Sequence, residues 1–413
     1  MPQIKTVLGA ALTSASLAAL VVPAAHAAAP SGPVPASAST AAASSGVTLA
    51  VRRQVSNVVP VVARVHLPDG APAGRVVVRR DGSVVASAPV AAGASGVRVE
   101  MPRLRHVGDH ALRAVFRPDG AGPLRSPVVT VTSRAGCAWS PHLCGFADRT
   151  NTGPRRDVTL RDVPGDITHG PGWHVDSRGW IEVDGADAVV RGIRTSLQLS
   201  ISGDNAVVED SVLAVPGDKY AVQLRHAEGV VVRRNLIRGG GTSPAQRLGC
   251  AIRDIYGDIR DLKLVGNEIK WSSTGIQVGS GLIARNYIHD FGLADGDHVN
   301  GLTSNGSTVP MTVRDNTILN QFEQTDAVSL FQDFGLEANR VISHNLLGGG
   351  GYSVYGGEGG YGTTHDIRIT DNRFTRTLFR RGGYYGPVAH FEDHGAGNEF
   401  SGNVWDGSGD PVR

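Results

Sequence analysis

The second half of the chain repeats one pattern of apolar and polar positions. Residues 230–240 (VVVRRNLIRGG) show its form: a few apolar residues, then an Asn, then further apolar residues. Related phrases follow down to the C-terminal region, and their asparagines are Asn235, Asn267, Asn286, Asn316, Asn345, Asn372 and Asn403. Alternation over so few residues is typical of short β-strands, and the Asn marks a turn between two of them.

A second set of strand-like phrases runs in step with the asparagines. These phrases begin at Tyr220, Cys250, Thr274, Asn300, Asp326 and Tyr352, so successive starts differ by 30, 24, 26, 26 and 26 residues. The third residue of each phrase is Val, Ile or Leu. A nearly fixed period of this length indicates a solenoid, in which stacked coils bury a shared apolar column that no single coil could bury alone.

The recurrence of Asn at one place in each coil has a physical explanation. We expect the Asn to adopt the left-handed conformation that a sharp corner requires. Stacked Asn side chains can also hydrogen-bond from coil to coil as a ladder.

These motifs resemble the right-handed parallel β-helix of the pectin-lyase-like superfamily, over roughly residues 145–407. The stretch CGFADRTNTGPRRDVTLRDVPGDI is expected to form the N-terminal cap and first coil. This stretch and the ending GGYYGPVAHF…GNVWDGSGDPV resemble a group of exported actinobacterial β-helix proteins. The resemblance implies a β-helix domain over 135–413. It implies no activity, because this fold carries lyases, hydrolases, adhesins and tailspikes.

The residues before the repeats have a different sequence pattern. Residues 47–134 contain roughly seven short alternating strands separated by turn sequences such as PDG and RDGS, which predicts a β-sandwich. The pattern GRVVVRRDGSVVASAPV…GDHALRAVFRPDG resembles bacterial Ig-like repeats, which implies a spacer or docking role. The predicted fold class is therefore all-β: an Ig-like sandwich followed by a right-handed parallel β-helix.

The N-terminal residues predict export. Residues 1–27 have a Lys, an apolar run and an AHA site, as in a signal peptide, with a transmembrane helix as the alternative, and 28–46 form a Pro/Ala/Ser linker. We expect a secreted, monomeric protein without a membrane span, with the cell wall as a possible attachment site for the Ig-like domain. An oxidising compartment favours a disulfide between Cys137 and Cys144, whereas Cys250 is expected to be a buried apolar residue.

Charge and composition exclude one class of partner. The formal net charge is only +2, and no basic run interleaved with aromatic residues is present, so nucleic acid is not an expected partner. A polysaccharide fits better, because the face of one β-helix sheet forms a long groove with side chains repeating about every 4.8 Å.

Acids and histidines concentrate in the coils around Asn300 and Asp326. The candidate catalytic residues are Asp326, Asp297, His298 and Asp333. The candidate substrate-binding residues are Asn300, Gln332, Tyr352, Tyr355, Glu358, Arg225, Tyr385 and His390. Each acid also has a plainer interpretation: Asp297 and Asp333 as turn residues, Asp326 as a strand-start residue that binds backbone amides, and Glu358 as part of a mobile glycine loop.

Three functions fit these residues. The first is glycoside hydrolysis by paired carboxylates. QTDAV faintly resembles the NTDG strand of polygalacturonase-like hydrolases, which would place Asp326 at an active acid, although Gln324 and Ala327 depart from that motif and the other family elements are missing.

The second function is β-elimination on a uronic-acid polymer, for which Asp295, Asp297 and Asp326 could hold Ca²⁺. Lysine bases are scarce, with only Lys219, Lys263 and Lys270 after the leader, which favours hydrolysis. The third is glycan binding without catalysis. Zinc-binding spacings and a serine nucleophile elbow are absent from the sequence.

Overall fold

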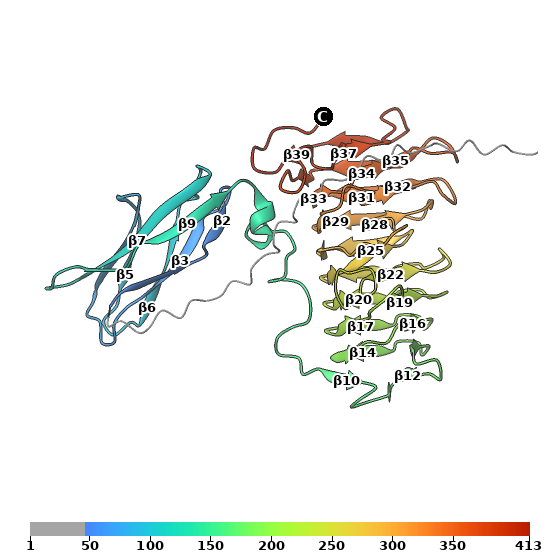
Figure 1. The fold of residues 1–413 in the computed structure, drawn as a ribbon, viewed down its shortest axis with the longest axis horizontal. Helices are drawn as coiled ribbons and strands as arrows, with labels where there is room; N and C mark the ends of the chain where they lie inside the picture. Colours follow the sequence, from blue (N-terminus) through green and yellow to red (C-terminus); the bar gives the residue numbers. More distant parts are fainter. Residues whose placement is uncertain (1–45) are drawn as a thin grey trace, which may run out of the picture. The chain divides into compact units, whose positions relative to one another are not determined.

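A computed structural model describes residues 46–413, so the predicted signal peptide and almost all of the predicted linker lie outside the described residues. The described chain is nearly all β-structure (Figure 1). No helix within residues 46–413 is long and apolar enough to cross a membrane.

The first strands form two antiparallel-rich sheets around one core. The smaller sheet has the order β1-β3-β6 and the larger β2-β9-β7-β4-β5, with β8 on β7 and a parallel pair between β2 and β9. Their bounds are β1 Thr48–Val51, β2 Gln54–Ser56, β3 Val61–His66, β4 Gly74–Arg80, β5 Ser83–Val90, β6 Gly96–Met101, β7 Gly108–Pro118, β8 Leu124–Arg125 and β9 Val129–Arg134. Alternate residues such as Val65, Val76 and Phe116 are fully buried in one cluster, which makes this region a β-sandwich. Its Ig-like classification stays a prediction.

Three long sheets make up the rest of the chain, and each coil visits them in the order eleven-, nine- and ten-stranded. The eleven-stranded sheet contains β11 His169–Gly170, β12 Trp173–Val175, β13 Ile181–Val183, β16 Leu199–Ile201, β19 Tyr220–Leu224, β22 Leu248–Asp254, β25 Ser272–Gln277, β28 Asn300–Ser304, β31 Asp326–Leu330, β34 Tyr352–Gly356 and β37 Gly386–Ala389. The nine-stranded sheet contains β14 Val189–Arg191, β17 Val207–Glu209, β20 Val231–Arg233, β23 Lys263–Val265, β26 Gly281–Ala284, β29 Met311–Arg314, β32 Ala338–Ser343, β35 His365–Thr370 and β38 Glu399–Ser401. The ten-stranded sheet contains β10 Arg161–Val163, β15 Ile193–Thr195, β18 Val212–Ala214, β21 Leu236–Arg238, β24 Glu268–Lys270, β27 Tyr287–His289, β30 Thr317–Asn320, β33 Leu346–Gly349, β36 Arg373–Phe374 and β39 Val404–Trp405.

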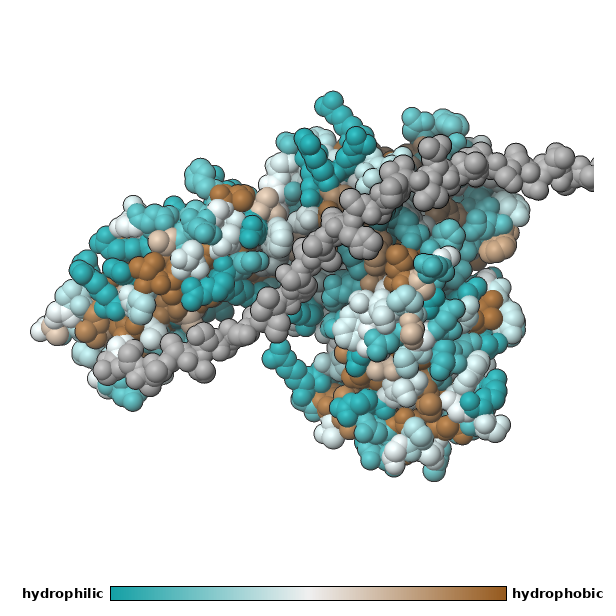
Figure 2. Space-filling model, viewed as in Figure 1, coloured by the Kyte–Doolittle hydropathy of each residue, from teal (hydrophilic) through white to brown (hydrophobic). Residues whose placement is uncertain are grey.

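Neighbouring strands in these sheets are parallel, apart from the antiparallel β11-β12-β13 hairpins at the N-terminal end. The predicted register is confirmed, because Ile276 pairs with Leu302, Leu302 with Val328, and Val328 with Val354. These third residues are fully buried in one continuous core. The β-strands therefore stack as the coils of a parallel β-helix, seen one above another in Figure 1. On the face shown in Figure 2, hydrophobic and hydrophilic residues are interspersed over sandwich and coils.

The asparagine ladder is present at the corner between the nine- and ten-stranded sheets. From Asn267 onward, each Asn side-chain oxygen accepts hydrogen bonds from the backbone N–H and the side-chain amide of the Asn one coil earlier, as Asn316 does from Asn286 at 2.8 and 3.0 Å. The Asn316 amide in turn donates to Ile283 O and to Asn345. The prediction of a left-handed Asn is wrong. The residue before each Asn takes that conformation, at Arg234, Gly266, Arg285, Asp315, His344, Asp371 and Gly402.

Residues 135–160, which we name the strap, run along the coils, whereas β10, near the end of the segment expected to form the cap and first coil, pairs with β15 in the ten-stranded sheet. Near its start lie η1 (Cys137–Trp139) and η2 (Pro141–Cys144), joined by the Cys137–Cys144 disulfide. The amides of Cys137 and Ala138 donate to the Asp406 carboxylate in the last coil, at 2.7 and 3.0 Å.

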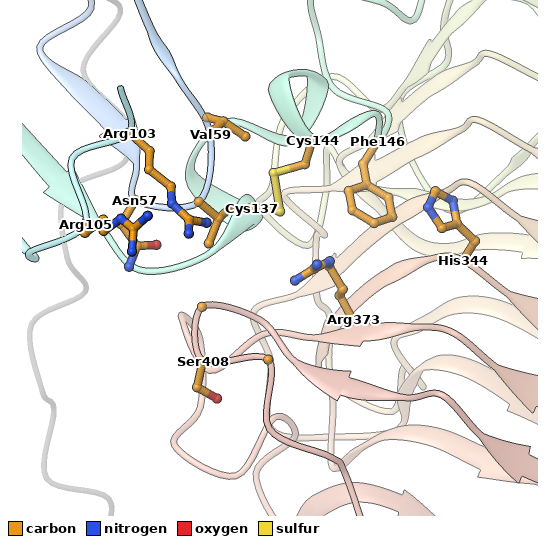
Figure 3. A pocket seen from close by; sticks show the side chains of 13 residues that line it. Asn57, Val59, Arg103, Arg105, Cys137, Cys144, Phe146, His344, Arg373 and Ser408 are labelled. Carbon is orange, nitrogen blue, oxygen red and sulfur yellow. A yellow bond between two sulfur atoms is a disulfide. The ribbon is translucent and has the colours of Figure 1, made fainter. Parts of the chain in front are cut away.

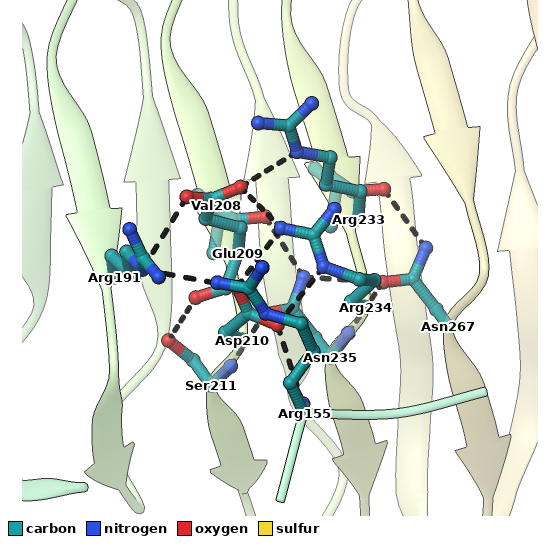
Figure 4. A network of polar contacts seen from close by, with 11 residues as sticks. Arg155, Arg191, Val208, Glu209, Asp210, Ser211, Arg233, Arg234, Asn235 and Asn267 are labelled. Carbon is teal, nitrogen blue, oxygen red and sulfur yellow. Dashed lines mark hydrogen bonds and ion pairs between the residues drawn. The ribbon is translucent and has the colours of Figure 1, made fainter. Parts of the chain in front are cut away.

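Further along the chain, the strap reaches the earlier coils. Gly153 N donates to Gly266 O at 3.0 Å. The Arg155 guanidinium lies 3.4 Å from the Asp210 carboxylate. In the same corner cluster, Glu209 and Asp210 also form ion pairs with Arg191, Arg233 and Arg234 (Figure 4). The strap therefore contacts both early and late coils of the β-helix.

Candidate functional site

The outer face of the eleven-stranded sheet is set by a bend in each strand. At the second and third positions two consecutive residues point inward. A Cβ added at Gly301 would lie 2.4 Å from Ile318 of the core, and Ala327, its counterpart one coil later, belongs to the core cluster, as does Val328. The first and fourth positions therefore point to the outer face. They form two columns with the members Tyr220, Cys250, Thr274, Asn300, Asp326 and Tyr352, and Gln223, Arg253, Gln277, Thr303, Ser329 and Tyr355.

Asp326 is the one carboxylate among these column residues. It pairs in register with Asn300, which confirms the expectation that the two lie side by side on adjacent coils. Its side chain is fully buried, and neither carboxylate oxygen has a hydrogen-bond partner within residues 46–413. Burial raises the pKa of Asp326 well above its usual value, and the nearby Ser329 hydroxyl and Gly301 amide, which lack good hydrogen-bonding geometry, offset only part of the rise.

Two further outer-face atoms beside Asp326 lack partners. The Ser329 hydroxyl and the Asn300 side-chain oxygen are buried and make no hydrogen bond within the described chain. Buried polar groups are normally bonded, and clusters of exceptions mark places where water, an ion or a ligand completes the bonding. A carboxyl held neutral in such a place can donate a proton, as a general acid must.

Tyrosines surround this carboxyl. Tyr352 contacts Tyr355 and Tyr385, with ring centroids 5.5 and 5.8 Å apart, and Tyr355 stacks on His390 at 5.7 Å. Burial and the charge of Asp326 raise the pKa of Tyr355 above its usual value. Tyr385 is 56% exposed, so the aromatic group opens to solvent and offers faces for sugar rings.

His390 and Glu358 form the rim beyond these tyrosines. Their side chains are both exposed and lie 3.5 Å apart. The predicted neighbours Tyr352, Tyr355, Tyr385, His390 and Glu358 are thus brought together next to Asp326 by three successive coils.

Gln332 is a structural residue, contrary to its predicted role in substrate binding. Its side-chain amide donates to Gly357 O and Gly362 O at 2.8 and 2.9 Å and accepts from Tyr361 N at 2.7 Å. These bonds use the whole amide to hold the loop that carries Glu358.

Asp297 is likewise engaged, which argues against its predicted catalytic role. Its two oxygens accept from the Arg247 guanidinium at 2.5 and 2.7 Å, and one also accepts from Ala294 N. Burial raises the pKa of Asp297, but the hydrogen bonds from Arg247 and Ala294 outweigh this effect and bring the pKa below its usual range. The carboxylate is therefore held ionised and paired.

The remaining candidates lie outside the two columns. Asp295, His298 and Asp333 are exposed loop residues, and the His298 carbonyl accepts a hydrogen bond from the Asn300 side-chain amide. Within residues 46–413, no three His, Cys, Asp or Glu side chains are arranged to hold a metal ion. The proposed Ca²⁺ ligands Asp295 and Asp297 thus find no third partner there.

A basic and aromatic area occupies the earlier coils of the same face. Arg253 donates to the Tyr220 hydroxyl at 2.6 Å, and Arg225 donates to Gln223 at 2.6 Å and to the Tyr256 hydroxyl at 3.1 Å. Neither guanidinium forms an ion pair with a carboxylate in the described chain. The sequence interpretation included Arg225 but missed Tyr220 and Tyr256. Tyr220 could have been found by following the first column down the repeat.

Comparisons with known proteins add little to this description. No protein-family model matches the chain, and no curated protein sequence matches it. Among solved structures, the chain is similar to the pectate lyase Pel3 from Pectobacterium carotovorum, with 10% sequence identity, 88% of this chain and 92% of that chain covered, and a TM-score of 0.19. At this score the similarity supports no conclusion about the site, and the fold stands on the strand pairing given above.

Proposed function

We propose that the protein cleaves a polysaccharide bound along the outer face of the eleven-stranded sheet, with Asp326 as the general acid. The observation that carries the proposal is the buried, unpartnered Asp326 carboxyl beside a cluster of tyrosines open to solvent. Burial raises its pKa, which favours the protonated form that would supply the proton to the leaving glycosidic oxygen.

Substrate access requires movement of the covering side chains. Asp326 is fully buried, so a glycosidic oxygen reaches it only when the side chains that cover it move aside; the partly buried Tyr352 and Tyr355 are the candidates for this movement. Sugar rings stacked on Tyr385 would stabilise that open arrangement.

The second carboxylate of a hydrolase would be Glu358. Glu358 lies 3.5 Å from His390, whose ring stacks on Tyr355 of the tyrosine cluster. In this role the Glu358 carboxylate would take part in the attack on the sugar while Asp326 protonates the leaving oxygen.

Export belongs to this proposal, with the activity outside the cell and the sandwich as a spacer or cell-wall attachment. Its grounds are the leader expected at residues 1–27 and the Ig-like pattern of residues 47–134.

Elimination is a second candidate because of the basic area on the same face. Arg225 and Arg253, which lack carboxylate partners in the described chain, could neutralise the carboxylates of a uronic-acid polymer. Elimination would leave an unsaturated uronide that absorbs in the ultraviolet, whereas hydrolysis would leave saturated reducing ends.

The test is a panel of neutral and acidic polysaccharides followed by product analysis. We expect cleavage of at least one glycan and a loss of about 10²- to 10⁴-fold in the Asp326→Asn variant. The matched control is Asp333→Asn, an exposed acid away from the columns, which should retain wild-type activity. Full activity in a folded Asp326→Asn variant contradicts the proposal, and glycan binding without any product would indicate a binding protein.

A further inference from the structure

A cavity of about 580 Å³ lies away from the outer face of the eleven-stranded sheet. Its walls come from the loop between β6 and β7, from the strap with its disulfide, and from the last coils (Figure 3). The volume falls within the range of cavities that hold small molecules or one segment of a polymer.

The charge of this cavity is one-sided. Arg103, Arg105 and Arg373 line it, and none of its 13 lining residues is acidic. Arg103 and Arg105 make no hydrogen bond or ion pair within residues 46–413. Figure 3 shows Arg103 and Arg373 facing the same opening from different walls.

The nearby acids are already occupied. Asp406 lies 3.8 Å from Arg373, but it is buried and accepts the amides of Cys137 and Ala138. Asp315 is paired with His344, at 2.7 Å. Arg373 therefore has one long ion pair, whereas Arg103 and Arg105 have no carboxylate partner in the described chain.

The aromatic wall adds a second feature. The Phe146 and His344 rings stack at 5.0 Å, and the His344 side chain is 54% exposed. A ring face beside several guanidinium groups suits a ligand that carries an oxyanion on a flat or cyclic body.

We propose that this cavity binds an oxyanion, a phosphate or sulfate ester. Guanidinium groups bind the oxygens of such anions with paired, charge-assisted hydrogen bonds, and a hollow lined by one sign of charge concentrates the opposite ion. One bound anion would contact Arg103 and Arg105 of the β6–β7 loop and Arg373 of β36, and so would tie these segments together.

The test is titration calorimetry of the full protein with inorganic phosphate, sulfate, a phosphomonoester and a phosphodiester, together with thermal unfolding. We expect saturable binding and a rise in Tm with ligand concentration. The Arg103→Ala and Arg373→Ala variants should each weaken binding about tenfold, and the triple variant with Arg105→Ala should abolish it. Binding of the esters but not of the free anions would identify the organic body as part of the ligand.

Matched controls are Arg98→Ala and Arg368→Ala, which remove the same charge from exposed strand positions outside the cavity. Both should bind as the wild type does. The inference is overturned if the triple variant binds unchanged, if the controls weaken binding equally, or if no oxyanion binds at millimolar concentration.

Loss of one site should not affect the other. The triple arginine variant should keep its glycan activity, and Asp326→Asn should keep its anion binding, so failure here is distinguishable from failure of the proposed cleavage.

Discussion

Two buried polar columns run through the same coils and differ in whether their atoms have partners. In the asparagine ladder, the Asn316 side chain makes four hydrogen bonds. On the outer face of the eleven-stranded sheet, four side-chain oxygens of Asn300, Asp326 and Ser329 make none within residues 46–413. The hydrogen bonds of the ladder therefore stabilise the solenoid. The unpaired oxygens on the outer face cost free energy, because a buried polar group without a partner is unfavourable, and a role in stability does not explain them.

We expect the largest loss of stability from Asn316→Ala, which removes one side chain of the asparagine ladder. The change removes four hydrogen bonds in a fully buried corner and leaves the Asn286 backbone N–H without its acceptor, so we expect a loss of about 4 kcal/mol in the free energy of unfolding. Urea denaturation measures it. Asn305→Ala, which removes one partly buried bond to Thr303, should cost under about 1 kcal/mol. Equal effects of the two would show that the ladder bonds are not special.

A paired acid should respond to pH in the opposite sense to Asp326. Burial raises the pKa of Glu268, but hydrogen bonds from His289 and Lys270 outweigh this effect and lower the pKa to about 2. Glu268 thus contributes stability that is present above the ordinary pKa of 4.5 and is lost as the pH falls toward 2, about 3 kcal/mol in all. Glu268→Gln should remove this amount at pH 7 and little near pH 2, as measured by unfolding at several pH values.

Asp326 is predicted to cost stability instead. Its folded pKa is raised, so the folded state holds a proton that the unfolded chain releases above about pH 4, and stability falls as the pH rises from there toward the folded pKa. We expect Asp326→Asn to be about 1 kcal/mol more stable than the wild type at pH 7 and equal to it at pH 3. A destabilised variant at pH 7 would mean that the carboxylate has partners after all.

The smallest predicted difference compares a serine-to-alanine change in the ladder with the same change on the outer face. Ser211 extends the ladder, since its hydroxyl accepts from Ile193 N and donates to Glu209 O, so Ser211→Ala should cost about 1 kcal/mol. Ser329→Ala removes an unpartnered hydroxyl and should change stability by less than about 0.5 kcal/mol. Thermal unfolding of the two variants side by side measures the difference.

The period of the repeat was enough to predict the coils and their register. The pairing of Asn300 with Asp326 follows from a count of 26 residues, because parallel coils stack in register. The same count could not reveal that the residue before each Asn turns left-handed, since that depends on how the backbone closes each corner.

The site was harder to predict because it depends on which atoms meet. Asp297 and Asp326 look alike in sequence, but Arg247, 50 residues earlier, pairs with Asp297 and nothing described pairs with Asp326. Gln332 likewise reaches a loop about 25 residues later. Partners this distant follow from loop conformation, which no repeat encodes.

The strap changes the order in which the protein can be completed. Its first residues bind Asp406, and its later ones bind Asp210 and Gly266. During synthesis the strap leaves the ribosome before any coil does, yet its anchor is made almost last. The later strap residues can bind the early coils as these coils emerge, but the first strap residues must wait for the last coil, so their anchoring is a late event that joins residues 269 positions apart.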